Sequence, residues 1–192
     1  MNRDEQAYAR RNQILTIALE QFIAKGFYGT STREIAKIAG MSSGLMFHYF
    51  KSKEALYECL IEIGCEKMVF DLTTAAQNPL KYLSEMVSST LHELQNNPLF
   101  AQMFVFMDMA HHTKEVSARA NTLLFEHDIA NQCIPIIIKG QQLGQLRSGD
   151  PHALTVAFFG AIQGIAQEVA RVPGTPVPEI QWILDIIRKG GD

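Results

Sequence analysis

Apolar residues recur at helical spacing along nearly the whole chain, and no segment alternates apolar and polar positions as a half-buried strand would. The first apolar stripe predicts a helix over about residues 7–25, which Gly26 ends. The last stripe predicts an amphipathic helix over about residues 178–189. Together with the segments between them, the pattern predicts an all-α fold of about nine helices.

Two short helices are expected directly after the first one. Residues 31–34 read Ser-Thr-Arg-Glu, which fits a capping box in which Ser31 accepts a backbone N–H and the Glu34 carboxylate reaches back to the cap. This helix should end at Gly40, and Ser42 can cap a third helix over about residues 43–50, too crowded with apolar groups to bury them all. Two short helices around a tight turn are the layout of a helix-turn-helix, whose second helix enters the major groove of DNA.

The rest of the chain carries clear helix starts. A long helix is expected from residue 53 to about 76. Residues 115–143 are also helical in pattern, although Pro135 must kink or interrupt that helix because it lacks a backbone donor. Three further helices each begin with Asn or Asp followed by proline, which are favoured at the cap and at the first helical position. Their expected ranges are 79–96, 98–112 and 151–171.

Charge is distributed unevenly along the chain. The 192 residues are 47% hydrophobic and 19% charged, with a formal net charge of −3, which is ordinary for a globular protein and argues against a protein coated in nucleic acid. Residues 1–54 nevertheless hold eight Lys and Arg against five Asp and Glu, whereas residues 55–192 hold nine against fifteen. The basic charge therefore lies at the end that carries the helix-turn-helix pattern, as DNA binding requires.

Cysteine usage and the N-terminus favour an intracellular protein. Cys59, Cys65 and Cys133 form neither a CxxC pair nor a zinc-finger spacing, and an odd number suits buried thiols in a reducing compartment. The N-terminus is polar through Gln13, and no uncharged apolar run reaches the ~18–20 residues that a membrane span requires. We therefore expect a cytoplasmic protein without a membrane partner.

Two adjacent histidines raise the question of a metal site. His111 and His112 each share a helix face with an acidic residue, Glu115 and Asp108 respectively, which is a spacing that metal ligands use. Adjacent histidines on a regular helix point about 100° apart, so they cannot hold one ion together, and no third ligand is evident. No nucleophile with a partner base is evident either. The sequence therefore predicts no metal, no cofactor and no enzymatic activity.

A series of short motifs at fixed spacing occupies residues 9–60. The motifs are Gly26-Phe27, Gly29-Thr30-Ser31-Thr32, Ile35-Ala36, Ala39-Gly40, Ser42-Ser43-Gly44, Phe47-His48-Tyr49-Phe50 and Lys51-Ser52-Lys53-Glu54-Ala55-Leu56. Together they resemble the N-terminal domain of the TetR family of bacterial transcriptional regulators. In the C-terminal part of the chain, Leu143-Gly144-Gln145-Leu146-Arg147 is similar to a pattern that is frequent in the same family. The resemblance implies a homodimer, with a helix-turn-helix DNA-binding domain in residues 1–52 and a helical effector-binding and dimerisation domain in residues 53–192.

The resemblance also implies which residues contact DNA. The matching positions are Thr30, Thr32, Arg33, Ser42, Ser43, Gly44, Leu45, Phe47, His48, Tyr49 and Lys53. The family commonly has Lys, Thr and Tyr where this chain has Ser43, Leu45 and Phe47. Leu45 can touch only an apolar edge such as a thymine methyl, and Phe47 has no hydroxyl for a phosphate. We therefore expect weaker nonspecific binding than in a relative with the lysine.

Residues 99–112 are apolar nearly all round, so their helix is either buried on most sides or faces an internal cavity. Methionine and phenylalanine side chains suit a pocket for a small apolar effector, and plain core is the alternative. The predicted pocket residues are Phe100, Met103, Phe104, Met107, His111, Phe125, Ile134, Ile137 and Phe159.

Small residues follow one strip of the expected 151–171 helix, so another helix can approach it closely. Two terminal helices from each subunit would form a four-helix interface whose two-fold axis matches a palindromic operator. An intramolecular core is the alternative. The predicted interface residues are Ala157, Phe158, Ala161, Ile162, Gly164, Ile165, Trp182, Ile183 and Ile187.

These expectations combine into a ligand-responsive transcriptional repressor. A homodimer would bind a palindromic operator in double-stranded DNA, and an apolar effector would change the spacing of the two DNA-binding heads. Two alternatives stay open: a helical enzyme or small-molecule carrier that keeps the head as a relic, and a transcriptional activator. Salt-dependent DNA binding separates the first of these from a regulator.

Overall fold

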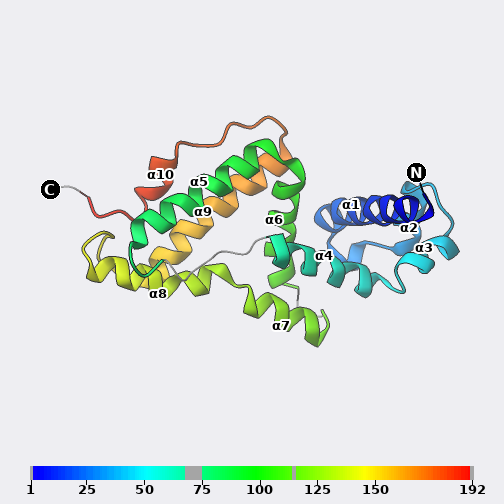
Figure 1. Ribbon diagram of the computed structural model, residues 1–192, viewed down its shortest axis with the longest axis horizontal. Coiled ribbons are helices and arrows are strands. Elements are labelled where there is room, and N and C mark those ends of the chain that lie inside the picture. Colours follow the sequence, from blue (N-terminus) through cyan, green and yellow to red (C-terminus); the bar gives the residue numbers. More distant parts are fainter. Residues whose placement is uncertain (1, 68–74, 114–115, 191–192) are drawn as a thin grey trace. The chain divides into compact units, whose positions relative to one another are not determined.

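The computed structural model describes residues 2–67, 75–113 and 116–190, which contain the helices α1 to α10 and no strand (Figure 1). By their contacts these residues divide into two compact units. Unit 1 comprises residues 2–67, 105–113 and 116–126, and unit 2 comprises residues 75–104 and 127–190. The all-α prediction is confirmed. The division differs from the predicted boundary at residue 52, because α4 and residues 105–126 group with the first three helices.

Unit 1 begins with the long helix α1. Asn2 and Glu5 close a capping box at its start, so α1 begins four residues earlier than expected. At Gly26 the backbone takes a positive φ of 69°, where the helix was predicted to end, and one further turn follows. The helices of unit 1 are α1 (Arg3–Gly29), α2 (Thr32–Ile38), α3 (Ser43–Tyr49), α4 (Lys53–Lys67), the second half of α6 (Pro98–His111) and α7 (Ala118–Glu126).

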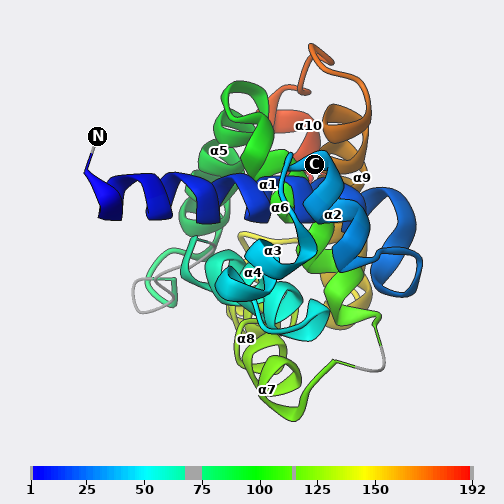
Figure 2. The ribbon, with the colours of Figure 1, turned by 90° about the vertical axis from the view of Figure 1, so that its right-hand side faces the viewer.

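Helices α2 and α3 have the predicted side-chain caps. Ser31 accepts a hydrogen bond from the backbone of Glu34, and Ser42 accepts one from the backbone of Leu45, each at 3.2 Å. The capping box at α2 is only half formed, because the Glu34 carboxylate pairs with Lys25 of α1 instead of reaching back. This ion pair ties α2 to α1, and α2 in turn packs against α3 (Figure 2).

Aromatic rings form the centre of unit 1. The ring of Tyr57 on α4 lies 4.9 Å from Phe22 and 5.0 Å from Phe27 of α1, and 4.9 Å from Phe106 of α6, measured between centroids. These edge-to-face arrangements are the favourable ones for aromatic pairs. The Tyr57 hydroxyl completes the cluster with a 3.2 Å hydrogen bond to Thr113. Burial raises the pKa of Tyr57 above its ordinary value, and the Thr113 hydrogen bond partly opposes this.

Unit 2 is a bundle in which α5 and α9 run side by side, with α8 and α10 packed against them (Figure 1). Asn78 and Asp150 cap α5 and α9 through side-chain oxygens, directly before the predicted prolines. The helices that complete unit 2 are α5 (Pro79–Asn96), the first half of α6, α8 (Ile129–Gln142), α9 (Pro151–Arg171) and α10 (Ile180–Leu184).

The segment after α8 is hydrogen-bonded to the residues that follow α10, and so fastens the C-terminal part of the chain. The backbone of Arg147 donates to Ile187, and Lys189 donates back to Gln145, which makes a short antiparallel bridge. The Arg147 guanidinium also donates to the carbonyl groups of Asp185 and Arg188, which follow α10. These contacts satisfy carbonyl groups at a helix end that would otherwise lack partners.

Two helix predictions differ from the structure, and a third lies partly outside the described residues. The expected 115–143 helix is two helices, with the break at Asp128, which caps α8, whereas α8 runs on through Pro135. Pro135 lacks the N–H that would bond the carbonyl group of Asn131, but both residues are exposed, so water can bind that carbonyl group. The last helix is only five residues long, followed by turns rather than by the helix expected up to 189. For the expected 53–76 helix, α4 is seen to Lys67, and residues 68–74 lie outside the described ranges.

Candidate nucleic-acid interface

Helix α3 is anchored by two apolar side chains and presents the others outward. Met46 and Phe50 are buried in unit 1. Leu45 and Phe47 keep 44% and 43% of their surface exposed, and His48, directly after Phe47, is exposed too. The prediction that some apolar residues of this helix must face outward is confirmed. The buried pair holds the helix so that its outer face is fixed in place.

Gly44 lies at the start of this outer face and is not required by packing. A Cβ atom built on Gly44 would have Ser42 Oγ as its nearest neighbour, at 4.0 Å, and its φ is not positive. Glycine weakens a helix relative to alanine, so its presence here has a cost without a packing reason. The space it leaves suits a partner whose surface must come close to the helix backbone.

Positive charge flanks α3 on the neighbouring helix. Arg33 and Lys37 of α2 are exposed and form no ion pair with any carboxylate of the described residues. Thr32, predicted as a DNA contact, is partly buried at the start of α2. Exposed guanidinium and ammonium groups beside an outward-facing helix are the arrangement that phosphate binding needs.

Two predicted DNA contacts point into the protein instead. The Thr30 side chain is buried, and its hydroxyl donates to the carbonyl groups of Gln21 and Gly26. The Lys53 ammonium donates to the carbonyl groups of Phe27 and Thr30 at 2.7 and 3.1 Å and lies 4.2 Å from the centre of the Phe27 ring. The Thr30 side chain thus closes the end of α1, and the Lys53 side chain joins the start of α4 to the end of α1, so both support the domain from within.

Arg11 is a positioning residue that sequence reasoning missed. Its guanidinium lies 5.0 Å from the centre of the Phe50 ring and donates a 3.0 Å hydrogen bond to Cys59 Sγ. It therefore holds the end of α3 to α1 and α4. Burial raises the pKa of Cys59, although Arg11 opposes the shift. Contacts between residues this far apart in sequence leave no local signal.

The nine predicted pocket residues do not come together in one described cavity. In unit 2, Ile137 lies in the core and Phe100, Phe104 and Phe159 pack against it half-buried. Met103 is buried, and Ile134 is half-buried. None of the nine lines the groove described below. The pocket assignment therefore stays a prediction for the residues of unit 2.

In unit 1 the predicted pocket residues have other surroundings. Phe125 near the end of α7 is 83% exposed, so it lines no interior pocket of unit 1, and its pocket assignment stays a prediction. Met107 is buried against Gly64 of α4, where a Cβ atom would lie 2.3 Å from the Met107 sulfur. Plain core explains Met107, which fills the space that the glycine leaves. His111 is exposed at the end of α6.

The predicted dimer residues divide between core and surface. Phe158, Ile162, Ile183 and Ile187 belong to the core of unit 2, so these four are not available to a second subunit, and their assignment was wrong. Ala157 and Gly164 are exposed on α9, and Ala161 and Ile165 partly so. Trp182 on α10 is 66% exposed.

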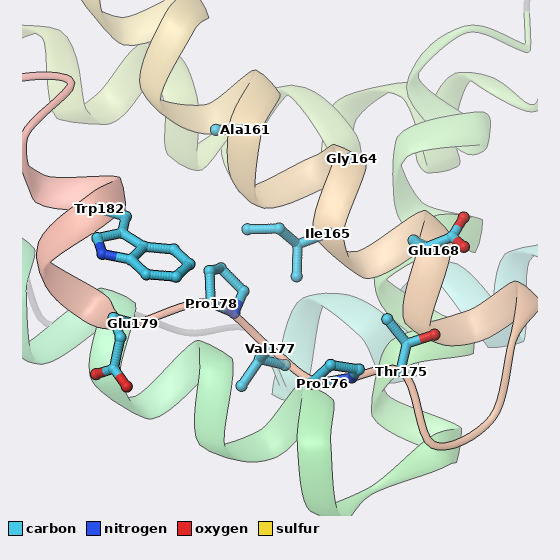
Figure 3. Close-up of a pocket in the computed structure, with 10 residues that line it drawn as sticks. All are labelled: Ala161, Gly164, Ile165, Glu168, Thr175, Pro176, Val177, Pro178, Glu179 and Trp182. Carbon is cyan, nitrogen blue, oxygen red and sulfur yellow. The ribbon is translucent and has the colours of Figure 1, made fainter.

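A shallow groove of about 610 Å³ runs along this exposed part of unit 2. Figure 3 shows Ile165, Pro178 and Trp182 around the groove, with Glu168 and Glu179 at its rim. Among the described helices, α9 is the one long and apolar enough to cross a membrane by length and composition, a test that a core helix of a soluble protein also passes. The outer strip of α9 is an apolar surface that no other described residue covers.

Comparison with known proteins decides the family. A family model described as bacterial regulatory proteins, tetR family, matches residues 14–60, from the middle of α1 into α4. The regulator RutR from Escherichia coli O157:H7 is 30% identical over 171 residues, which cover 85% of this chain and 77% of RutR. The chain belongs to the TetR family of bacterial regulators. Its N-terminal helices are therefore the helix-turn-helix head of that family, as the motifs indicated.

Other relatives agree at lower coverage. The repressor KstR2 from Mycobacterium tuberculosis is 29% identical over 109 residues, which cover 55% of this chain and 53% of KstR2. The chain therefore spans about half the length of the first curated relatives it matches. The structure of that ketosteroid transcriptional regulator superposes with a TM-score of 0.70 at 20% identity, covering 94% of this chain and 96% of KstR2. The MbdR regulator from Azoarcus sp. CIB gives a TM-score of 0.73 at 20% identity, covering 92% and 96%. At these identities the structures establish the fold.

Proposed function

We propose that this TetR-family protein is a ligand-responsive transcriptional repressor. The observation that carries the proposal is an outward-facing α3, fixed by buried Met46 and Phe50, in a helix-turn-helix of this family. The second helix of such a motif lies in the major groove. Repression rather than activation is favoured by the relatives named as repressors.

The DNA face that we propose excludes the two inward-pointing side chains. Arg33 supplies phosphate contacts, and α3 supplies the contacts to base edges. Thr30 and Lys53 contribute by shaping the turn that leads into α2. The DNA face consists of Thr32, Arg33, Ser42, Ser43, Gly44, Leu45, Phe47, His48 and Tyr49.

A homodimer would place two DNA faces on one palindromic operator. The support is the exposed strip of small residues on α9, where Ala157 and Gly164 leave room for a second helix, together with the exposed Trp182. A strip of this kind is self-complementary across a two-fold axis, because the same surface can meet itself. The groove of Figure 3 would then be covered by the second subunit.

The effector that we propose is small and largely apolar, and it would bind in unit 2. The support is a set of half-buried aromatic side chains, Phe100, Phe104 and Phe159, that pack against the core without being enclosed by it. Aromatic linings of this kind suit apolar ligands. A similar structure is that of a ketosteroid regulator, which is consistent with an apolar ligand class. The effector would act by binding the DNA-released state more tightly.

The decisive experiment is a titration of the purified protein with the duplex upstream of its own gene, followed by fluorescence anisotropy at several salt concentrations. We expect binding that weakens steeply as salt rises, because phosphate contacts release counterions. Arg33→Ala should weaken binding and reduce the salt slope by about one. Lys139→Ala removes the same charge from an exposed position on α8. It is the matched control and should leave the affinity and the salt slope unchanged. A protein that binds no duplex at low salt is not a repressor.

The dimer is tested by sedimentation of single-site variants. Ala157→Glu places a charge in the proposed strip and should shift the protein toward monomer, since an unpaired charge at a close helix contact is costly. Ala118→Glu is the matched control at an exposed alanine that begins α7 in unit 1, and it should leave the mass unchanged. A monomeric parent protein, or equal dissociation in both variants, would contradict the proposed interface.

A further inference from the structure

The outer face of α3 lacks the side chains that usually read base pairs. Residues 43–49 are Ser-Gly-Leu-Met-Phe-His-Tyr, without Arg, Lys, Asn, Gln, Asp or Glu. Bidentate recognition of guanine needs Arg or Lys, and that of adenine needs Asn or Gln. Only Ser43, His48 and Tyr49 can form side-chain hydrogen bonds from this helix. Helix α3 therefore cannot recognise guanine or adenine through these bidentate side-chain pairings.

What α3 offers instead is apolar surface on both sides of its outer face. At about 100° per residue, Leu45 and Phe47 stand about 160° apart across the outer face, on either side of Gly44 and His48. Each keeps more than two fifths of its surface exposed, although both are large apolar groups. Because Met46 and Phe50 are buried, the helix cannot turn to hide them. The open space at Gly44 lets the flanking side chains come close to a surface that contacts the helix.

One group in the major groove matches this surface. The 5-methyl group of thymine is the apolar feature among the base edges there, whereas the other edges present donors and acceptors that lose hydration when an apolar side chain covers them. We propose that Leu45 and Phe47 are specificity-determining residues that recognise thymine methyl groups in each half-site. This inference rests on the proposed function, since it requires that α3 enters the major groove. It predicts an operator that is defined by methyl positions more than by hydrogen bonds.

Uracil substitution isolates the methyl group. A duplex bound by the protein is first selected from a random-sequence library, and each thymine is then replaced in turn by uracil, which keeps every hydrogen-bonding group. At one or two positions in each half-site we expect about fourfold weaker binding per methyl lost, the factor that corresponds to about 0.8 kcal/mol for one buried CH₂-sized group. At those positions, 5-methylcytosine paired with guanine should also be bound more tightly than cytosine paired with guanine.

Protein variants assign each methyl to a side chain. Leu45→Ala should abolish the uracil effect at one position and Phe47→Ala at another, with thermal stability unchanged because both side chains are exposed. Leu99→Ala, at an exposed leucine of α6 outside the head, is the matched control and should keep the full uracil effect. Equal affinity for the thymine and uracil duplexes would overturn the inference while leaving DNA binding intact. Failure to select any duplex would overturn the proposed function itself, and the inference with it.

Discussion

Gly44 and Lys53 belong to the same series of family motifs, but they have different physical roles. Gly44 has open space around it and no conformational need to be glycine, whereas Lys53 is fixed by two carbonyl groups and an aromatic ring. A substitution at the first should therefore affect recognition, and one at the second should affect folding. Residue type and motif position alone do not separate the two cases, because both follow from what surrounds the side chain.

Gly44→Ala is expected to weaken DNA binding at least tenfold while leaving the protein as stable or slightly more stable. The added methyl group meets only Ser42 Oγ, at an unstrained 4.0 Å, and alanine favours helix by up to about 1 kcal/mol over glycine. The same methyl group would stand between α3 and an approaching duplex. Anisotropy titration measures the first effect and urea denaturation the second. Unchanged affinity would mean that DNA does not approach α3 at Gly44.

Lys53→Ala is expected to lower the free energy of unfolding by roughly 1–3 kcal/mol, because two carbonyl groups lose a charged donor. Its DNA affinity should fall only as far as the folded fraction does. Lys51→Ala removes the same charge from an exposed position two residues earlier and should leave stability unchanged. Urea denaturation of both variants is the measurement. Equal stability of the two would remove the structural role assigned to Lys53.

At the scale of elements, local chemistry predicted where helices begin better than where they end. Asn78, Asp150, Ser31 and Ser42 all act as caps, because a cap depends on the first turn alone. The break before α8 was missed, because Asp128 has no proline after it and the more conspicuous Pro135 lies on an exposed side where a helix tolerates it. Helix ends depend on such tertiary circumstances, which a sequence pattern does not contain.

One close helix contact in unit 2 depends on a glycine. A Cβ atom at Gly140 of α8 would lie 2.6 Å from Cγ and Cδ1 of Leu146 and 3.2 Å from Cβ of Pro79. Leu146 is buried in the segment that fastens the C-terminal residues, so it cannot easily move aside. Gly140 is therefore required by packing, in contrast to Gly44.

Gly140→Ala is expected to lower the free energy of unfolding by roughly 1–3 kcal/mol, the usual cost of overpacking a core. Gly44→Ala provides the matched control, since it makes the same chemical change where the nearest atom, Ser42 Oγ, is 4.0 Å away. Urea denaturation of the two variants under identical conditions is the measurement. A Gly140→Ala protein as stable as its control would show that Leu146 has room to rearrange.

At the scale of the whole molecule, sequence predicted the fold class and the head but not which face of α9 is outside. Phe158 and Ile162 turn inward to the core of unit 2, whereas Ala157 and Gly164 turn outward. The apolar character of the helix on nearly all sides hides this division, because periodicity marks a buried face only when the opposite face is polar. The pocket residues could not be predicted for the same reason, because the residues that line a cavity are of the same types as those that fill a core.

Buried thiol and phenol groups make the stability of the fold sensitive to alkaline pH. Burial raises the pKa of Cys133 to about 12, and it raises the pKa values of Cys65 and Tyr57 as well. Above about pH 9 the unfolded chain loses protons that the folded chain keeps, so stability is full below that pH and falls as pH rises. Each such group contributes up to about 1.4 kcal/mol per pH unit. Urea denaturation at pH 7 and pH 10 should show the loss, and Cys133→Ala should reduce it. Equal stability at both pH values would contradict the burial of these groups.

The groove of unit 2 contains the only tryptophan of the chain, Trp182, with two thirds of its surface exposed. An indole in water emits at longer wavelength than one enclosed by apolar groups, so the intrinsic fluorescence of the unlabelled protein reports directly on whether this groove is covered. Dilution of a dimer should therefore shift the emission to the red with a midpoint at the dissociation constant. Because α3 contains no tryptophan, the same signal follows subunit assembly separately from contacts that DNA makes to α3.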